Sequence, residues 1–184
     1  MHPLFMLLKY RDLPGGLDRA PNNWLKASRT YESTFNLYFS ALHPPGMFAE
    51  QRYLSMVQAA EAYHKQKYGK RTDLKQRIQQ LTCRFGESLR PLVGDPLGFA
   101  VRVYNTRNYY AHYDSRNREK SASGYELHLL TQHMSYLVRA CLLAELGFDD
   151  SAIGNLFRNS RQFKFVADET AAFAGRQGGT DGRD

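Results

Sequence analysis

The chain has 184 residues, of which 42% are hydrophobic and 23% charged, and its formal net charge is +7. This size and balance predict one domain with a buried core, and they exclude a chain that is disordered throughout. No apolar run approaches the roughly 20 residues of a membrane-spanning helix, and the first residues lack the basic region and cleavage site of a signal peptide. We therefore expect a cytoplasmic protein without a membrane partner.

The first predicted helix spans residues 23–42 and follows an N-terminal extension over residues 1–22. Asn23 is the expected N-cap, and the sequence HPPG at 43–46 ends the helix because proline cannot continue it. The apolar side chains that recur at helical spacing are Trp24, Tyr31, Phe35, Tyr38 and Leu42.

The second and third predicted helices have clear signals at their ends. The second runs from about Met47 to Tyr68 and ends at Gly69, a residue that readily adopts the left-handed conformation of a helix C-cap. Thr72 or Asp73 is expected to cap the third, which reaches Arg84.

The fourth predicted helix follows a break at RPLVGDP, residues 90–96. Asp95 is its expected cap and Pro96 its first residue, and the helix continues to about Tyr113. A polar stretch, DSRNREKSASG, then predicts a loop over residues 114–124.

The last part of the chain contains a fifth predicted helix, from Tyr125 to Leu146, and a shorter one after Asp149. Five or six helices with short connections predict an all-α antiparallel bundle of about five helices. We assign this helical domain to residues 23–166 and expect residues 167–184, which end in a glycine-rich sequence, to form a disordered tail.

Positive charge is concentrated between residues 64 and 90. Eight Lys and Arg residues stand against two acids there, so the segment carries +6. A solvated helix face and a nucleic-acid-binding surface both explain this charge, and the sequence leaves the two open.

Polar residues follow the apolar stripe of the fourth predicted helix. Arg107 and Asn108 stand where the spacing calls for core residues, and a buried polar group must find a partner. Asn108 and His112 lie about 40° apart around a helix, whereas Arg107 and His112 lie about 140° apart. We therefore expect Arg107 to approach His112 only if the last turn distorts. The stripe itself consists of Leu97, Ala100, Val101 and Tyr104 and continues through Arg107, Asn108 and Ala111.

A partner for these polar residues is predicted on the second helix, where Leu54 and Val57 are followed at the same spacing by Glu61. A buried glutamate is rare unless it is paired. We expect Glu61 to face Arg107 or Asn108 and to orient the motif, and the alternative is an exposed Glu61 at the edge of the helix.

Signatures of a cofactor site are missing from the sequence. It contains no HExxH, no CxxC and no glycine-rich phosphate loop, and His128 and His133 have the wrong spacing to share a metal ion. We therefore expect no metal and no cofactor.

The motif RNYYAH (107–112) has the R-polar-x3-H form of the Rx4-6H motif that defines the HEPN superfamily. Together with FSALHPPGMFAEQRYLSMVQAAEAYHKQKYG (39–69) and YNTRNYYAHYD (104–114), it resembles the ApeA-like HEPN group. The resemblance covers about Trp24 to Gly147. It implies a metal-independent endoribonuclease, in most cases a homodimer in which the motifs of two subunits meet in one cleft.

The resemblance also implies a role for each motif residue. Arg107 would hold or polarise the scissile phosphate, Asn108 would orient the histidine or the phosphate, and His112 would act as general acid or base. The RNA 2′-OH is the nucleophile, so the expected products carry a 2′,3′-cyclic phosphate and a 5′-OH. Members of this group act in prokaryotic anti-phage defence, and many have a large domain before the HEPN part, so a regulatory or sensor partner is expected.

Residues around the motif extend the predicted site. Tyr109 joins Glu61 as an expected supporting residue, and the motif tyrosines either stack on bases or pack in the core or a dimer interface. Two alternatives to the nuclease remain, a non-catalytic module that dimerises or binds nucleic acid and a toxin-like protein whose activity a partner masks. The basic residues expected to contact RNA are Arg116, Arg118, Lys120, Lys65, Lys67, Lys70 and Arg71.

Overall fold

The computed structural model describes residues 16–42, 46–69 and 71–178. These residues form nine α-helices and one 3-10 helix, η2 (Ser115–Asn117), and no strand occurs among them. The predicted all-α class is therefore confirmed. The helices are α2 (Gly16–Thr30), α3 (Glu32–Leu42), α4 (Ala49–Tyr68), α5 (Leu74–Arg84), α6 (Gly86–Val93), α7 (Pro96–His112), α8 (Gly124–Glu145), α9 (Asp150–Asn159) and α10 (Arg161–Gly178).

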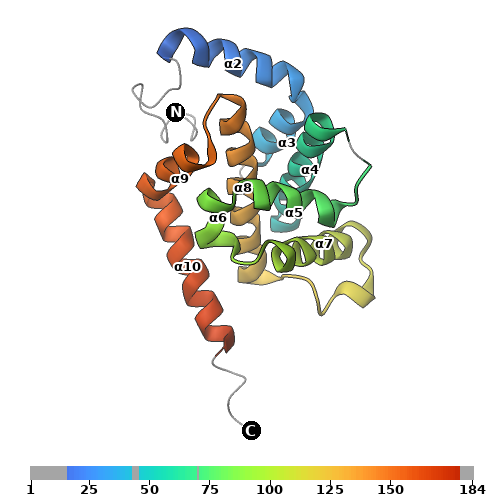
Figure 1. Cartoon of the computed structure of the whole chain (residues 1–184). Helices are drawn as coiled ribbons and strands as arrows, with labels where there is room; N and C mark the ends of the chain where they lie inside the picture. The colour runs from blue at the N-terminus through green and yellow to red at the C-terminus, as the bar shows by residue number, and fades with distance from the viewer. Residues whose placement is uncertain (1–15, 43–45, 70, 179–184) are drawn as a thin grey trace.

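Helix α8 lies at the centre of the bundle, with α4 packed along it and α3 packed on α4 (Figure 1). It is buried nearly all round, as expected for a helix that is apolar on every side. Tyr136 of α8 packs edge-on against Phe157 and Phe163, with ring centroids 5.1 and 5.0 Å away. Arg139 is also buried in this helix, and its Nε donates a 2.6 Å hydrogen bond to the hydroxyl of Tyr38.

Three predicted helix ends are present in the structure. Asp73 caps α5, where its carboxylate accepts a 2.7 Å hydrogen bond from the backbone N–H of Gln76. Asp95 caps α7 and accepts from two backbone N–H groups of its first turn. Gly69 ends α4 with φ 59°, the left-handed conformation that a glycine adopts without strain.

The first predicted helix differs from the structure at its start and in its middle. It begins at Gly16 and is divided at Tyr31 into α2 and α3, so Asn23 lies inside α2 and is not an N-cap. The Nδ2 of Asn23 instead donates a 3.4 Å hydrogen bond to the carbonyl of Leu146. The division at Tyr31 places that ring 5.0 Å from the ring of Tyr63 in the core. These long-range contacts override the local capping signal.

The predicted break at residues 90–96 is narrower in the structure. Helix α6 includes Pro91, and only Gly94 and Asp95 separate α6 from α7. Leu89 and Leu92 are buried in the core, and their burial favours a helix through the proline. The start of α6 is capped from a distant helix, because the carboxylate of Asp150 accepts hydrogen bonds from two backbone N–H groups of α6.

Helix α10 continues past residue 166 to Gly178, inside the segment predicted as a disordered tail, and residues 179–184 lie outside the described part of the chain. Side-chain contacts with α8 hold it in place. His133 and Thr170 share a 2.8 Å hydrogen bond, and the hydroxyl of Tyr125 donates to Glu169. In the described segments, no helix combines the length and apolar character that crossing a membrane requires.

Candidate active site at the end of helix α7

Helix α7 brings the RNYYAH motif to one edge of the bundle. One face of the helix is buried, and the motif occupies its last two turns, which end in a loop that contains η2 (Figure 1). Helix α5 packs along α7, and the beginning of α5 lies over the half of α7 that carries the motif. The buried residues that fix α7 in the bundle are Phe99, Ala100, Val103 and Thr106.

The side chains of Arg107, Asn108 and His112 converge. Nη1 of Arg107 donates a 3.3 Å hydrogen bond to Oδ1 of Asn108 and lies 3.5 Å from Nε2 of His112. The helix is regular through His112, so the long arginine side chain, not a distortion of the last turn, spans the angular separation between the two residues. An arginine can only donate, so a hydrogen bond between the two groups has Nε2 of His112 as its acceptor.

The three motif residues differ in exposure. Arg107 and Asn108 are half-buried, and His112 is exposed. Arg107 lies close enough to the buried hydroxyl of Tyr53 for its charge to act on it. Burial raises the pKa of Tyr53 well above its usual value, while a hydrogen bond to Thr106 and the charges of Arg102 and Arg107 oppose the increase. The site thus has a half-buried cation at Arg107 and a solvent-facing histidine.

Glu61 has no direct contact with the motif. It is half-buried on α4, and in the described part of the chain neither a hydrogen bond nor an ion pair joins it to Arg107 or Asn108. The hydrogen bond to Arg107 that was expected from Glu61 is made by Asn108. The orienting role of Glu61 remains a prediction that no contact supports.

The three motif tyrosines occupy different environments. Tyr110 packs against the core and donates a 3.1 Å hydrogen bond to the carbonyl of Ala122, and burial raises its pKa. The ring of Tyr109, a predicted supporting residue, is half-buried between its neighbours, 4.9 Å from the ring of Tyr110 and 6.0 Å from that of Tyr113. Tyr113 is 72% exposed. Core packing therefore explains Tyr110 but not Tyr113.

The loop after α7 is fastened to the helix by groups that the sequence reading missed. The hydroxyl of Thr106, buried on α7, accepts a 3.0 Å hydrogen bond from the backbone N–H of Ala122. Nη1 of Arg102 donates to the carbonyl of Lys120, and its Nη2 pairs with Glu126. The sequence did not identify Thr106 as a contact to the loop, because its position is typical of any amphipathic helix.

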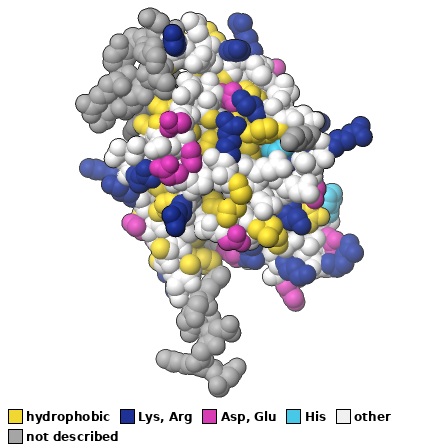
Figure 2. Space-filling view, in the orientation of Figure 1, with side chains coloured by type: hydrophobic (Ala, Val, Ile, Leu, Met, Phe, Trp, Pro, Cys, Tyr) yellow, Lys and Arg dark blue, Asp and Glu magenta, His cyan; other side chains and the backbone are white. Residues whose placement is uncertain are grey.

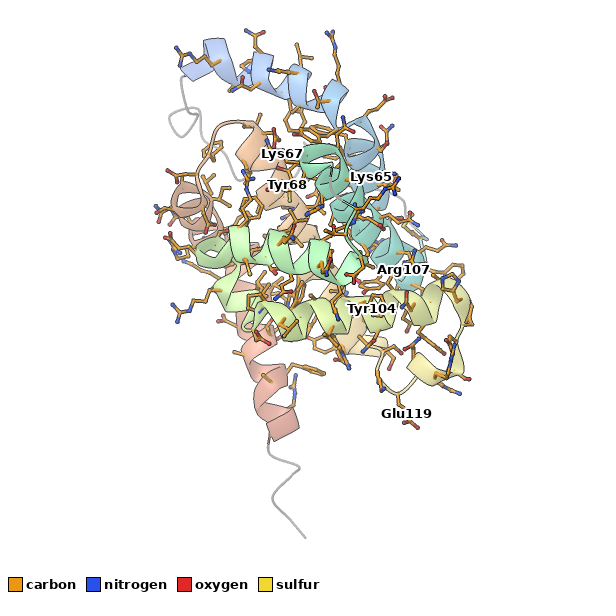
Figure 3. All side chains as sticks on the ribbon, turned by 45° about the vertical axis from the view of Figure 1, so that its right-hand side comes forward. Lys65, Lys67, Tyr68, Tyr104, Arg107 and Glu119 are labelled. Carbon is orange, nitrogen blue, oxygen red and sulfur yellow. The ribbon has the colours of Figure 1, made fainter. Side chains whose placement is uncertain are left out.

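The basic residues of this loop are not equivalent. Arg116 forms a 2.7 Å ion pair with Asp114, and this contact lowers the pKa of the Asp114 carboxyl. Arg118 and Lys120 are exposed, with no side-chain ion pair to the described residues. Figure 2 shows Lys and Arg side chains gathered over this end of α7, and Glu119 points away from α7 in Figure 3. Two unpaired cations therefore lie in the loop that follows His112.

The upstream basic residues lie at the end of α4 and in the segment that leads to α5. Lys65 and Lys67 occupy the C-terminal end of α4, well separated from Arg107 (Figure 3). Lys67 forms a 2.9 Å ion pair with Glu145, which also accepts a hydrogen bond from the hydroxyl of Tyr63. Arg71 is exposed, and Lys70 lies outside the described residues. The described residues predicted to bind RNA thus come from three segments, the end of α4, the residues before α5 and the loop after α7.

The motif has no metal cluster beside it in the described part of the chain, and two cavities lie elsewhere. No group of three or more His, Cys, Asp or Glu residues there is arranged to hold a metal ion. Cavities of about 640 Å³ beside α6 and about 300 Å³ between α2 and Lys67 are lined by other residues. The end of the motif faces solvent, since His112 and Tyr113 are both exposed.

Comparison with known proteins gives one match. The Apea-like HEPN family model matches residues 54–152, more than half of the chain, from α4 to α9 and including the motif. Neither a curated protein nor a solved structure matches. HEPN domains are of a nuclease or RNA-binding type, and they commonly bind RNA and dimerise. The fold, the position of the motif on α7 and this match together show that the chain belongs to the Apea-like HEPN family.

Proposed function

We propose that this protein is a metal-independent endoribonuclease in which Arg107, Asn108 and His112 promote attack of an RNA 2′-OH on the adjacent phosphodiester. The observation that carries the proposal is the 3.5 Å approach of Arg107 Nη1 to Nε2 of an exposed His112. It pairs a donor suited to a phosphate with a group ready to accept a proton. The resemblance to HEPN nucleases supports a role in prokaryotic anti-phage defence under the control of a sensor partner.

The reaction follows from the chemistry of these groups. A bound phosphate would attract the Arg107 guanidinium, with Asn108 keeping the guanidinium in place, and Nε2 of His112 would be released to take the 2′-OH proton. The 2′-oxygen then bonds to phosphorus while the bond from phosphorus to the 5′-oxygen breaks. The 5′-oxygen leaves with a proton from a general acid, which gives a 2′,3′-cyclic phosphate and a 5′-OH end. Arginine charge stabilises the transition state.

A second copy of the chain would supply the general acid. Alongside the motif, α7 has an apolar face that the described chain leaves uncovered, with Leu97 48%, Val101 37% and Tyr104 38% exposed. This face continues along the helix to Asn108 and His112, since residues spaced three and four apart share one side of a helix. A two-fold contact between two such faces would bring two motifs together, and His112 of the second copy would protonate the leaving 5′-oxygen.

The same exposed end of the molecule would bind the RNA backbone. Arg118 and Lys120 are the best candidates, because both are exposed and unpaired in the described chain, whereas Asp114 already neutralises Arg116. Lys65 and Lys67 lie at the end of α4 and would contact RNA away from the cleavage site, and the ion pair with Glu145 weakens the case for Lys67. Arg71 is exposed just before α5 and would also contact the RNA backbone. Binding through these cations would weaken as salt increases.

The test is cleavage of single-stranded RNA in the presence of EDTA. We expect the purified protein to produce fragments with 2′,3′-cyclic phosphate ends, and His112→Ala to lower the rate by about 10²–10⁴, the usual contribution of acid–base catalysis. His128→Ala is the matched control, since His128 is also an exposed histidine but lies on α8, and it should cleave at the wild-type rate. Undiminished cleavage by His112→Ala would falsify the assignment, and RNA binding without cleavage by the wild type would favour the non-catalytic alternative.

A further inference from the structure

Two helices of this protein end in the same backbone geometry with different residues. Helix α4 ends at Gly69 with φ 59°, and α7 ends at Tyr113 with φ 51° and ψ 34°, in the left-handed region. In both cases the backbone N–H of the cap residue bonds to the carbonyl four residues earlier. Tyr113 is the sole non-glycine residue with positive φ in the described part of the chain. A side chain here is strained, and glycine would satisfy the turn equally well.

Packing does not compensate for that strain. The Tyr113 side chain is 72% exposed and makes no hydrogen bond to any described residue, and its ring contact is an edge-on approach to Tyr109 at 6.0 Å. Tyr110, three residues earlier, shows the opposite situation, with its ring against the core and its hydroxyl bonded to Ala122. The fold has no evident need for the Tyr113 ring, which stands in solvent directly after His112.

The surroundings of Tyr113 fit a polyanion with flat, apolar groups. Tyr109 supports the ring from one edge and leaves most of its surface open. The loop that follows carries the exposed cations Arg118 and Lys120. An aromatic face beside unpaired cations is the arrangement that holds single-stranded nucleic acid, because every base presents a π-face and every linkage a phosphate.

We propose that Tyr113 is a stacking platform for an RNA base next to the cleaved linkage, and that it positions the strand on His112. This inference rests on the proposed ribonuclease function and adds the residue that selects an unpaired base there. A base inside a duplex cannot stack on an outside ring, so the platform restricts the substrate to single-stranded or looped RNA.

The decisive variant distinguishes a role of the Tyr113 ring in RNA binding from a role in folding. Tyr113→Gly removes the ring and relieves the left-handed strain, so we expect its Tm to increase by about 2–4 °C. In a His112→Ala background, which prevents cleavage, the same change should weaken binding of a single-stranded RNA oligonucleotide about tenfold to a hundredfold. Tyr113→Phe keeps the ring and should bind RNA like its parent. A variant that is more stable and yet binds RNA less well is not expected of a purely structural residue.

A double-mutant cycle with the RNA tests the stacking contact itself. Each oligonucleotide in this cycle lacks one base near the mapped cleavage site. One of them should bind the protein that retains Tyr113 about tenfold more weakly than the intact RNA does. For Tyr113→Gly, removal of that base should cause no further loss. An equal loss for both proteins at every position overturns the stacking contact.

Two further results distinguish the possible failures. If the wild-type protein cleaves RNA and Tyr113→Gly retains full affinity, the platform is wrong while the nuclease stands. If the wild-type protein neither binds nor cleaves RNA, both proposals fail. Sedimentation velocity adds one more result. A shift of Tyr113→Gly from dimer to monomer would assign the ring to a subunit interface and overturn the RNA contact.

Discussion

Helices α7 and α8 differ in how far the fold accounts for their residues. Helix α8 is buried nearly all round, and two of its buried side chains, Arg139 and His133, have partners inside the protein, Tyr38 and Thr170 respectively. Helix α7 buries one face and leaves Val101, with its apolar neighbours, exposed beside the motif. Burial inside the bundle accounts for most residues of α8, whereas the exposed apolar face of α7 has no covering element in the described part of the chain.

The largest effect is expected where α7 has no partner within the chain. Val101→Glu places a charge in the middle of the exposed apolar face, where a second copy would have to bury it at a high cost. We expect the dimer to dissociate and RNA cleavage to fall by about 10²–10⁴, because the second histidine is lost. The free energy of unfolding of the monomer should change by less than about 0.5 kcal/mol, as for most surface substitutions.

Light scattering and cleavage assays on the same samples check this prediction. The control is Phe165→Glu, which charges another exposed apolar residue, 63% exposed, on α10. It should remain dimeric and active. A Val101→Glu protein that stays dimeric and cleaves RNA would show that the exposed face of α7 is not the contact.

The second prediction tests α8. Leu137 is fully buried, and Leu137→Ala leaves a cavity in the centre of the bundle. We expect a loss of about 2–5 kcal/mol in the free energy of unfolding, measured by urea denaturation. Val101→Ala on α7 is the matched truncation and should cost less than about 0.5 kcal/mol. Equal losses would mean that the two helices are equally integrated into the core.

The third prediction concerns pH. Burial lowers the pKa of His133 in α8 to about 4, below its ordinary value of 6.5. As pH decreases below 6.5, the unfolded chain binds a proton that the folded chain does not, so stability is present above pH 6.5 and is lost progressively down to pH 4. Between pH 7.5 and 5 the loss from this residue should be about 2 kcal/mol.

The measurement is urea unfolding at several pH values, with the difference between wild type and His133→Gln isolating this histidine from the carboxylates. The variant keeps a polar group opposite Thr170 but has nothing to titrate in this range. Its stability should therefore decrease less than that of the wild type between pH 7.5 and 5. Parallel curves for the two proteins would contradict burial of a neutral His133.

The features of this protein that depend on neighbouring residues could be predicted from its sequence. The end of α4 and the starts of α5 and α7 were predicted at Gly69, Asp73 and Asp95, because a cap depends on residues within one turn. The all-α class followed from helical periodicity, and the HEPN resemblance followed from the spacing of Arg107 and His112 within the motif. Each of these signals involves neighbours in the chain.

Tertiary structure decided the features that depend on distant residues. It divided the first helix at Tyr31, turned Asn23 toward α8 and paired Lys67 with Glu145. Whether a face of α7 is buried or exposed is set by helices far along the chain, and periodicity cannot distinguish the two. The sequence by itself therefore determined the all-α class, several helix ends and the motif residues. Only the packing decided that Arg107 reaches His112 on an open surface and that the Tyr113 ring stands free beside them.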